Sequence, residues 1–510
     1  MATARSRIAT FSPGRRSGQA AKATSGGGSS AKVMTWILGL LVVLSAVPVA
    51  SARPSWWLLW TAVIAILSIL WMWRQSLRPH RGGSTLDRLF SGYKTLFLLA
   101  FLVPLYGVAQ SLDLAFMIPD GLLAMPDALA WVESPAISVM PAGSFIAALR
   151  LAGFLMFLML VVAIATRRER VQLLTRILFW GVALQGAWAL VALQLLDDFS
   201  LIGEKTDYLG VATGTFVNRN SLATFLGFGL VLGAVLVGRR LGPQDGAVMR
   251  VSRPIGLFEK LGMEGFFVLL GMLLIALALV QTQSRLGLAS SLAGLFVTVM
   301  LLWSRSAAFG MRHVLVGLLA LVVAGALALV LGSDGLSERA LFVDRDSDTR
   351  WNLYVQIWDM IRMRPLTGFG LDSFGAAFEA FRAPPLNSNA SYHLAHNSYL
   401  ALWSEMGLVF GSLPPLLLAA VAVILWRKLR AENDFPAQAA GAIGVMVVGA
   451  LHSLGDFSLE MPANNYLFLA VIGLGMGIRR TSRRPAPVEV PMPVTPREGT
   501  TVIVPSGHIS

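Results

Sequence analysis

Long apolar runs alternate with shorter polar connections along almost the whole chain. A helix needs about 20 apolar residues to cross the hydrocarbon core of a bilayer, and twelve runs approach or exceed that length. The predicted spans cover about residues 33–50, 55–73, 94–110, 143–166, 172–196, 220–238, 264–281, 286–304, 313–331, 396–426, 438–455 and 463–478. Lipid offers no partner to an unpaired backbone group, so each segment must satisfy its own hydrogen bonds. The pattern therefore predicts an all-α polytopic membrane protein.

The longest polar interval between two apolar runs covers residues 332–395. Within it, one face of a predicted helix that ends at Pro365 carries Trp351, Tyr354, Val355, Trp358 and Ile361. A second short helix is predicted from about Ser373 to Arg382. Two tryptophans on one helical face are typical of a helix that lies at a membrane interface. We therefore expect a large loop that forms a two-helix cap over the bundle.

Basic residues mark alternate connections between the spans. If the N-terminus is cytoplasmic, every inner connection carries Arg or Lys, whereas the outer connections carry mostly Asp and Glu. This is the positive-inside pattern, and an even number of spans places both termini in the cytoplasm. The large loop then lies on the outer, periplasmic side. The net charge of +13 is explained by this topology, so no nucleic-acid partner is expected.

The predicted organisation has five parts. They are a disordered basic cytoplasmic tail at 1–32, helices 1–9 at 33–331, the periplasmic loop at 332–395, helices 10–12 at 396–478 and a disordered cytoplasmic tail at 479–510.

Only 14% of residues are charged, against about a quarter in a soluble domain. The chain has no cysteine, which excludes a disulfide framework, a thiolate metal site and a cysteine nucleophile.

A few basic side chains lie on the otherwise acidic outer side. Arg219 and Arg285 each begin a predicted span, and Arg350 begins the first loop helix. One arginine alone can be a snorkelling side chain that meets lipid phosphate. Arg285 follows the polar run Gln281–Ser284, which is costly at a span end unless it faces a cavity. Several arginines that converge there would bind a lipid-linked phosphate or pyrophosphate, because guanidinium pairs with phosphate oxygens bidentately.

Three further residues could carry chemistry. His396 begins the tenth span and is either satisfied by a backbone group or a proton acceptor for a hydroxyl nucleophile. His393 could form a metal pair with it, but no third ligand has a recognisable spacing. Glu405 is an intramembrane carboxylate that could pair with an arginine or act as an alternative base. We expect no metal and no cofactor.

An ordered set of segments resembles the O-antigen ligase and polymerase superfamily. The segments are FVNRNSLATFLGF, TQSRLG, RWNLYVQIWDMIRMRPLTGFGLDSF and HNSYLALWSEMGLVFG, within roughly residues 205–425. The resemblance implies a glycosyltransferase of the bacterial inner membrane that uses an undecaprenyl-pyrophosphate-linked glycan as donor. A ligase passes the glycan to lipid A-core, whereas a polymerase passes it to another lipid-linked repeat.

The resemblance also assigns residues. The family's arginine in the TQSR-type motif matches Arg285, and its loop histidine matches His396; a further family arginine matches Arg219 or Arg350. We therefore expect a metal-independent O-antigen ligase-like enzyme in which His396 and Arg285 are catalytic. Arg219, Arg285 and Arg350 would bind pyrophosphate, with His393 and Glu405 as supporting candidates. The expected partners are the lipid-linked donor, a glycan or lipid A-core acceptor and the lipid bilayer.

Three alternatives stay open at this point. A polymerase would use the same donor and the same arginines, and protein O-glycosylation would change only the acceptor. A transporter of lipid-linked sugar would need polar residues deep within several spans, but the middle of the predicted spans is almost free of charge. This distribution favours a site at the outer surface over a conduit.

Overall fold

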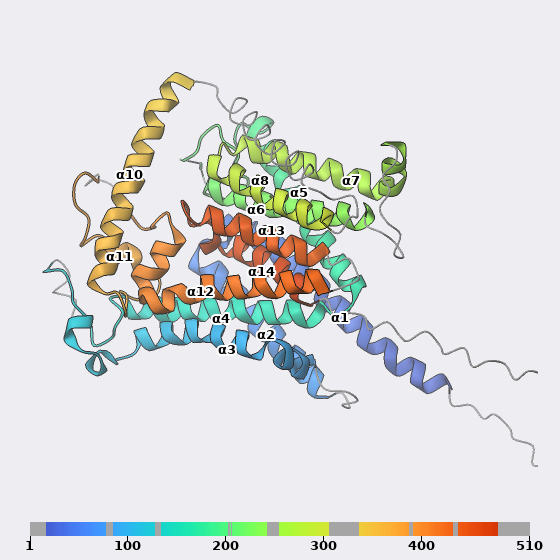
Figure 1. Ribbon diagram of the computed structural model, residues 1–510, viewed down its shortest axis with the longest axis horizontal. Coiled ribbons are helices and arrows are strands. Elements are labelled where there is room, and N and C mark those ends of the chain that lie inside the picture. The colour runs from blue at the N-terminus through green and yellow to red at the C-terminus, as the bar shows by residue number, and fades with distance from the viewer. Residues whose placement is uncertain are drawn as a thin grey trace, which may run out of the picture. The chain divides into compact units, whose positions relative to one another are not determined.

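A computed structural model describes residues 17–77, 85–127, 134–201, 204–205, 207–241, 254–304, 336–386, 391–431 and 437–477 (Figure 1). These residues form 13 α-helices and no strand, so the all-α class is confirmed. The helices are α1 (Ser17–Ser45), α2 (Pro54–Ser76), α3 (Thr85–Ser111), α4 (Pro141–Ile164), α5 (Arg168–Gln194), α6 (Arg219–Leu241), α7 (Pro254–Gln281), α8 (Arg285–Trp303), α10 (Leu336–Met363), α11 (Phe374–Phe378), α12 (Ser398–Ala431), α13 (Ala437–His452) and α14 (Pro462–Gly477).

Eight of these helices are long and apolar enough to cross a membrane, namely α2 to α8 and α12. Helices α1, α13 and α14 coincide with three further predicted spans, but their apolar parts are shorter. The predicted span at 313–331 lies outside the described residues. Helix α1 begins at Ser17, inside the tail predicted at 1–32. The chain is thus a multi-pass helical membrane protein, and the number twelve stays a prediction.

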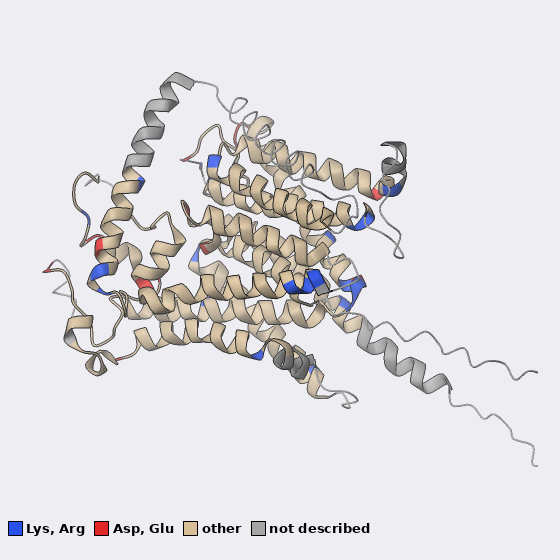
Figure 2. Cartoon of the chain, in the orientation of Figure 1, with Lys and Arg blue, Asp and Glu red and all other residues tan. Residues whose placement is uncertain are grey.

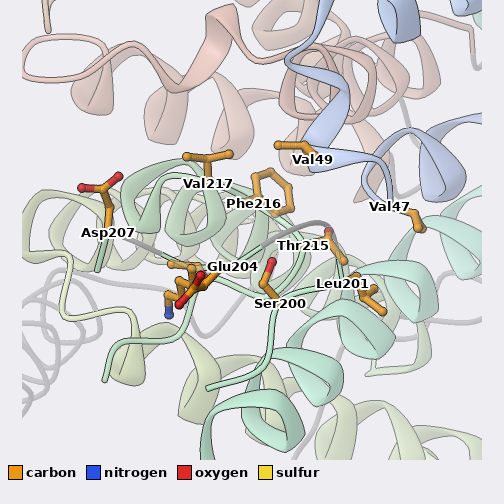
Figure 3. Close-up of a pocket in the computed structure, with 11 residues that line it drawn as sticks. Val47, Val49, Ser200, Leu201, Glu204, Asp207, Thr215, Phe216 and Val217 are labelled. Carbon is orange, nitrogen blue, oxygen red and sulfur yellow. The ribbon is translucent and has the colours of Figure 1, made fainter. Parts of the chain in front are cut away.

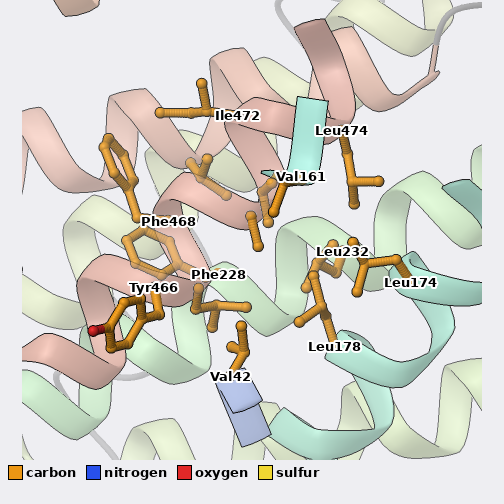
Figure 4. Packing of buried hydrophobic residues seen from close by; sticks show 14 of the residues in the cluster. Val42, Val161, Leu174, Leu178, Phe228, Leu232, Tyr466, Phe468, Ile472 and Leu474 are labelled. Atoms are coloured by element: carbon orange, nitrogen blue, oxygen red, sulfur yellow. The ribbon is translucent and has the colours of Figure 1, made fainter. Parts of the chain in front are cut away.

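Helix α6 forms the centre of the bundle. Every residue from Ser221 to Leu236 is buried, against α5, α7, α8, α13 and α14. A Cβ on Gly227 would lie 2.1 Å from the Ser291 hydroxyl of α8, so glycine is what lets these two backbones approach. Phe228 of α6 packs with Tyr466 and Phe468 of α14 in the same apolar core (Figure 4). By contrast, α2 and α12 leave most of their apolar side chains on the outside of the bundle, where lipid would cover them.

The two ends of the bundle differ in charge. At one end, which we call the basic end, α4, α6, α12 and α14 finish while α5 begins, and Lys and Arg gather there (Figure 2). Lys428 of α12 donates to the Gly475 carbonyl of α14 at this end. At the other end, which we call the loop end, α6, α8, α12 and α14 begin and the connections are longer. The positive-inside rule predicts a cytoplasmic basic end, and this sidedness stays a prediction.

Helices α10 and α11 cap the loop end, and α10 runs crosswise to α12 (Figure 1). The predicted single apolar face of α10 is wrong. Leu353, Ile357, Met360 and Ile361 are buried in a small core with α11 and the start of α12, whereas Trp351, Val355 and Trp358 are 69%, 47% and 38% exposed. The helix has two separate apolar stripes, because one of them packs on α12 and on the segment around α11.

The segment after α10 enters the bundle between α3, α4 and α12. Leu371 packs there against Val103, Ala148 and Met406. Gln110 of α3 donates to both the Thr367 carbonyl and the Glu405 carbonyl, at 2.8 and 2.9 Å. These contacts fix the cap to the membrane helices.

Helix α12 breaks at Gly407 and not at its internal Pro414–Pro415 pair, although proline is a common cause of a break in a helix. Gly407 has φ +72°, and a Cβ there would lie 2.2 Å from the Leu366 carbonyl oxygen. Leu408 N–H then donates to the Pro365 carbonyl at 2.7 Å. The break follows from the inserted segment, which takes over backbone pairing at Gly407, and not from the prolines.

The buried side chain of Arg364 stabilises the cap through hydrogen bonds. Its side chain is only 1% exposed and donates to three backbone carbonyls, those of Leu123, Ala124 and Ile137, at 2.7–3.0 Å. Burial lowers the Arg364 pKa to about 10, so the guanidinium remains charged at neutral pH. This arginine therefore has a structural role.

Candidate active site

The first turns of α6 and α8 are joined at the loop end. Ser284 caps α8 by accepting from Gly287 N–H at 3.2 Å, and its hydroxyl donates to the Asn220 side-chain oxygen at 2.7 Å. Asn220 and Ser284 are the direct neighbours of Arg219 and Arg285. The two predicted arginines thus emerge from adjacent helix starts, and the Arg285 side chain is exposed.

Arg350 of α10 lies near the same two helix starts. Its Nη1 donates to the Gly455 carbonyl at 3.1 Å, and a Cβ on Gly455 would lie 2.9 Å from the Leu286 side chain. Tyr208 connects Arg350 with Arg219, whose guanidinium lies 5.3 Å from the Tyr208 ring centroid. Burial raises the Tyr208 pKa, while the charges of Arg219 and Arg350 both act to lower it. The three arginines that the sequence singled out therefore surround one short stretch of the loop end.

His396 lies beside a buried carboxylate. Its Nδ1 is 3.7 Å from Asp456 Oδ1, and its ring packs edge-on against Phe457 with centroids 5.2 Å apart. The Tyr354 hydroxyl donates to the His396 carbonyl at 2.7 Å, and the backbone there has φ +48°. About a third of the His396 side chain, 34%, is exposed, whereas Asp456 is 1% exposed. Asp456 and Phe457 therefore fix one side of the imidazole, and its other side is accessible to solvent.

Asp456 is shared between two histidines. His452 Nδ1 lies 3.7 Å from Asp456 Oδ2, and the Ser458 hydroxyl donates to the same oxygen at 2.6 Å. Burial alone would raise the Asp456 pKa, but His396, His452 and Ser458 together outweigh it and hold that pKa below its usual range. The carboxylate is therefore ionised at neutral pH and can stabilise positive charge on a neighbouring imidazole.

Several buried polar atoms at this place have no hydrogen-bond partner in the described part of the chain. They are Arg219 Nε, His396 Nδ1, both ring nitrogens of His452 and Asp456 Oδ1. Buried polar groups are nearly always paired in native proteins, and exceptions cluster at sites of function. Contacts between catalytic groups are often long before substrate binds. The cluster thus presents polar atoms that could pair with a polar ligand.

The two supporting candidates lie elsewhere in the cap. His393 is exposed, and its Nδ1 would lie 3.2 Å from a Cβ on Gly375 of α11. The Glu405 carboxylate accepts from Phe374 N–H at 3.1 Å and so caps the start of α11. The side chains of both residues lie beside α11, while the backbone carbonyl of Glu405 accepts from Gln110 of α3. None of these described contacts joins either residue to His396.

Sequence reasoning missed Asp456, His452 and Tyr208 as members of this cluster. His452 and Asp456 are four residues apart, the spacing that aligns side chains on one helical face, and this was the available signal. Nothing in the periodicity shows that the segment after α13 folds over His396. That contact rests on pairs distant in sequence, such as Ser398 N–H with the Ser453 carbonyl at 3.0 Å.

A small cavity lies near the cluster without including it. It has a volume of about 100 Å³ and is lined by residues that include Val49, Glu204, Asp207 and Thr215 (Figure 3). Neither His396 nor any of the three arginines lines it. We therefore place the candidate site at the His396–Asp456 cluster and not in this cavity.

No group of three His, Asp or Glu side chains suited to a metal ion occurs among the residues that the structure describes. The charged groups present are arginines beside a carboxylate and two imidazoles. Such a set can bind an anion and accept a proton.

A comparison with family models gives one match. Residues 270–413 match the family described as O-Antigen ligase. The match covers Arg285, Arg350 and His396, and it ends before Asp456. The resemblance to the O-antigen ligase superfamily is thus confirmed, and it supports an enzyme of the glycosyltransferase kind. A comparison with curated proteins finds no match.

Proposed function

We propose that this protein transfers a glycan from undecaprenyl pyrophosphate to a sugar hydroxyl of lipid A-core. The reaction would take place on the periplasmic face of the bacterial inner membrane, with both termini cytoplasmic. The observation that carries the proposal is the position of His396, which faces a buried, ionised Asp456 beside Arg219, Arg285 and Arg350. The family match over residues 270–413 supports the same class of reaction.

His396 is the proposed base. The acceptor hydroxyl attacks the anomeric carbon of the donor, a new carbon–oxygen bond forms, and its proton passes to the imidazole. With Asp456 on the Nδ1 side, Nε2 is the nitrogen that receives the proton. Asp456 then stabilises the imidazolium and fixes the ring orientation, as the carboxylate of a catalytic triad does.

The arginines are the proposed leaving-group site. The bond between the anomeric carbon and the phosphate oxygen breaks, and undecaprenyl pyrophosphate leaves with the bonding electrons. Its growing negative charge needs fixed positive charge nearby, which Arg285 and Arg219 supply from two adjacent helix starts. Guanidinium groups do this without a metal, because they pair bidentately with phosphate oxygens and stay charged at any working pH.

The membrane sets the depth of the site. Arg219 and Arg285 begin two spans, so the arginines lie where a bound lipid would carry its phosphates. The isoprenoid tail would remain in the hydrocarbon region while the glycan extends into the periplasm. A lipid-linked pyrophosphate is the donor class that fits this arrangement.

A reconstituted transfer assay tests the proposal. The purified protein in vesicles receives the lipid-linked glycan donor with lipid A-core as acceptor, with and without a chelator, and the products are separated on a gel. We expect glycan on lipid A-core with wild type, an unchanged yield with the chelator, and no product with His396→Ala. Lengthened lipid-linked chains without capped core would instead establish a polymerase. Donor that crosses the membrane without any transfer would establish a transporter and refute the proposal.

A further inference from the structure

One apolar stripe of α10 is turned away from the small core that buries the other side of this helix. It consists of Trp351, Val355 and Trp358, which are 69%, 47% and 38% exposed. We call it the tryptophan stripe. Exposed tryptophan is costly in water, because an aromatic side chain has roughly 150–250 Å² of surface that it can bury. On the inner side of the same helix, by contrast, Leu353 and Ile357 are fully buried.

The tryptophan stripe continues onto a membrane helix. The Trp358 ring packs against the Trp403 ring of α12, with centroids 6.4 Å apart. Trp403 Nε1 in turn donates to the Ser412 hydroxyl at 3.0 Å.

Ser412 lies on the outward side of α12. It comes three residues after Val409 and four before Leu416, so the three share one helical face, and Val409 and Leu416 are 62% and 63% exposed. Since α12 is one of the predicted spans, this outward face is the one that lipid covers. The stripe on α10 and the lipid-facing side of α12 are therefore one continuous apolar surface.

A cation lies at the end of the stripe. Arg362 has a side chain that is 68% exposed and lies 3.5 Å from the exposed Asp359 carboxylate, and its guanidinium lies 5.9 Å from the Trp358 ring centroid. An apolar surface of tryptophans edged by arginine fits the headgroup layer of a bilayer, where the rings meet the acyl boundary and the cation meets phosphate.

We propose that the tryptophan stripe lies in the headgroup layer of the membrane leaflet at the loop end and anchors α10 there. The occupant of this surface is bilayer lipid, because the stripe runs without interruption into the lipid-facing side of α12. The inner side of α10 carries Arg350 and Tyr354, which contact Gly455 and His396. The anchor therefore sets the depth of two groups of the candidate site. The proposal does not depend on which reaction the site performs.

Site-directed spin labelling tests this in the full-length protein. The chain has no cysteine, so Val355→Cys gives one label site on the stripe and Asn352→Cys gives a matched site on the polar side of the same helix. The protein is reconstituted in vesicles of phosphatidylethanolamine and phosphatidylglycerol. Collision of the label with oxygen, which concentrates in lipid, is compared with collision with a water-soluble nickel chelate.

We expect the label at residue 355 to collide several-fold more with oxygen than with the chelate, and the label at residue 352 to show the reverse preference. Replacing both Trp351 and Trp358 by serine should move the label at residue 355 toward the aqueous pattern, whereas phenylalanine at both positions should not. Equal chelate access at residues 355 and 352 would place the stripe in water and overturn the proposal. Protection of residue 355 from both agents, growing with protein density, would assign the surface to a second copy and also overturn it.

Discussion

The role assigned to Asp456 can be tested by removing its charge and little else. Asp456→Asn keeps the size of the side chain and an oxygen that can accept from the Ser458 hydroxyl, now at 2.6 Å. It removes the negative charge that lies 3.7 Å from His396 Nδ1. The carboxylate is ionised throughout the neutral range, because its pKa is held below the usual value. The substitution therefore changes the charge at every working pH.

The expected loss follows from this distance. Two unit charges about 4 Å apart attract each other by about 4 kcal/mol at an effective dielectric constant of about 20. This is an upper limit, because the imidazole gains only part of its charge in the transition state. Each factor of ten in rate corresponds to about 1.4 kcal/mol, so we expect kcat to fall by roughly two to three orders of magnitude. The KM for the donor should stay close to wild type, because the three arginines are untouched.

The assay is initial-rate transfer by purified protein in vesicles, with donor and acceptor varied separately. Thermal unfolding of the same preparation, compared with wild type, separates a catalytic loss from a folding defect. A kcat within about tenfold of wild type in a stable Asp456→Asn protein would refute the reasoning, because the attraction then contributes less than about 1.4 kcal/mol. A donor KM that rises by as large a factor as kcat falls would instead assign Asp456 to donor binding.

Three further results follow from the structure. Burial raises the Glu460 pKa to about 7; the folded state then keeps a proton that the unfolded chain loses above about pH 4.3, so stability falls as pH rises through 4–7. Glu460→Gln should therefore be more stable than wild type at pH 8 by about 3.5 kcal/mol, because the two pKa values differ by about 2.7. It should unfold at nearly the wild-type temperature at pH 4, and an equal rise in unfolding temperature at both pH values would contradict this. Gly407→Ala should cost about 2 kcal/mol or more, since φ is +72° and the new Cβ would meet the Leu366 carbonyl; unchanged thermal unfolding would show that the α12 break is not needed. His393→Ala should retain transfer activity, because its contacts are with α11. Loss of product on the gel would show that His393 belongs to the site.

The apolar periodicity predicted the membrane helices closely. The span expected at 143–166 is α4, Pro141–Ile164, and the one expected at 220–238 is the inner part of α6, Arg219–Leu241. Such runs are set by local composition, because lipid leaves the backbone no alternative to a helix. The candidate arginines also came from local signals, since Arg219 and Arg285 are charges at the starts of apolar runs.

The features that the sequence did not predict depend on contacts between residues that are distant in sequence. Asp456 looked like an ordinary outer acid, and only the fold of the segment after α13 places it against His396. The break in α12 occurs at Gly407 because the segment after α10 pairs with it there. The apolar positions of α10 fall on two faces because one face packs on α12, a helix distant in sequence whose position periodicity does not describe. Helix positions are local properties, whereas the assembly of a site from residues on several distant segments is not.

The central claim is that the arginines at the helix starts of the loop end support glycan transfer. Arg285→Ala tests it most directly, with Arg382→Ala as the matched control, because Arg382 is a cap arginine paired with Glu379 at 3.0 Å. Both variants are supplied to membranes that lack the protein, with lipid-linked donor and lipid A-core acceptor, and their membrane levels are measured alongside. The account predicts no glycan on lipid A-core with Arg285→Ala and a near-normal yield with Arg382→Ala. Normal transfer by Arg285→Ala at normal membrane levels would contradict it.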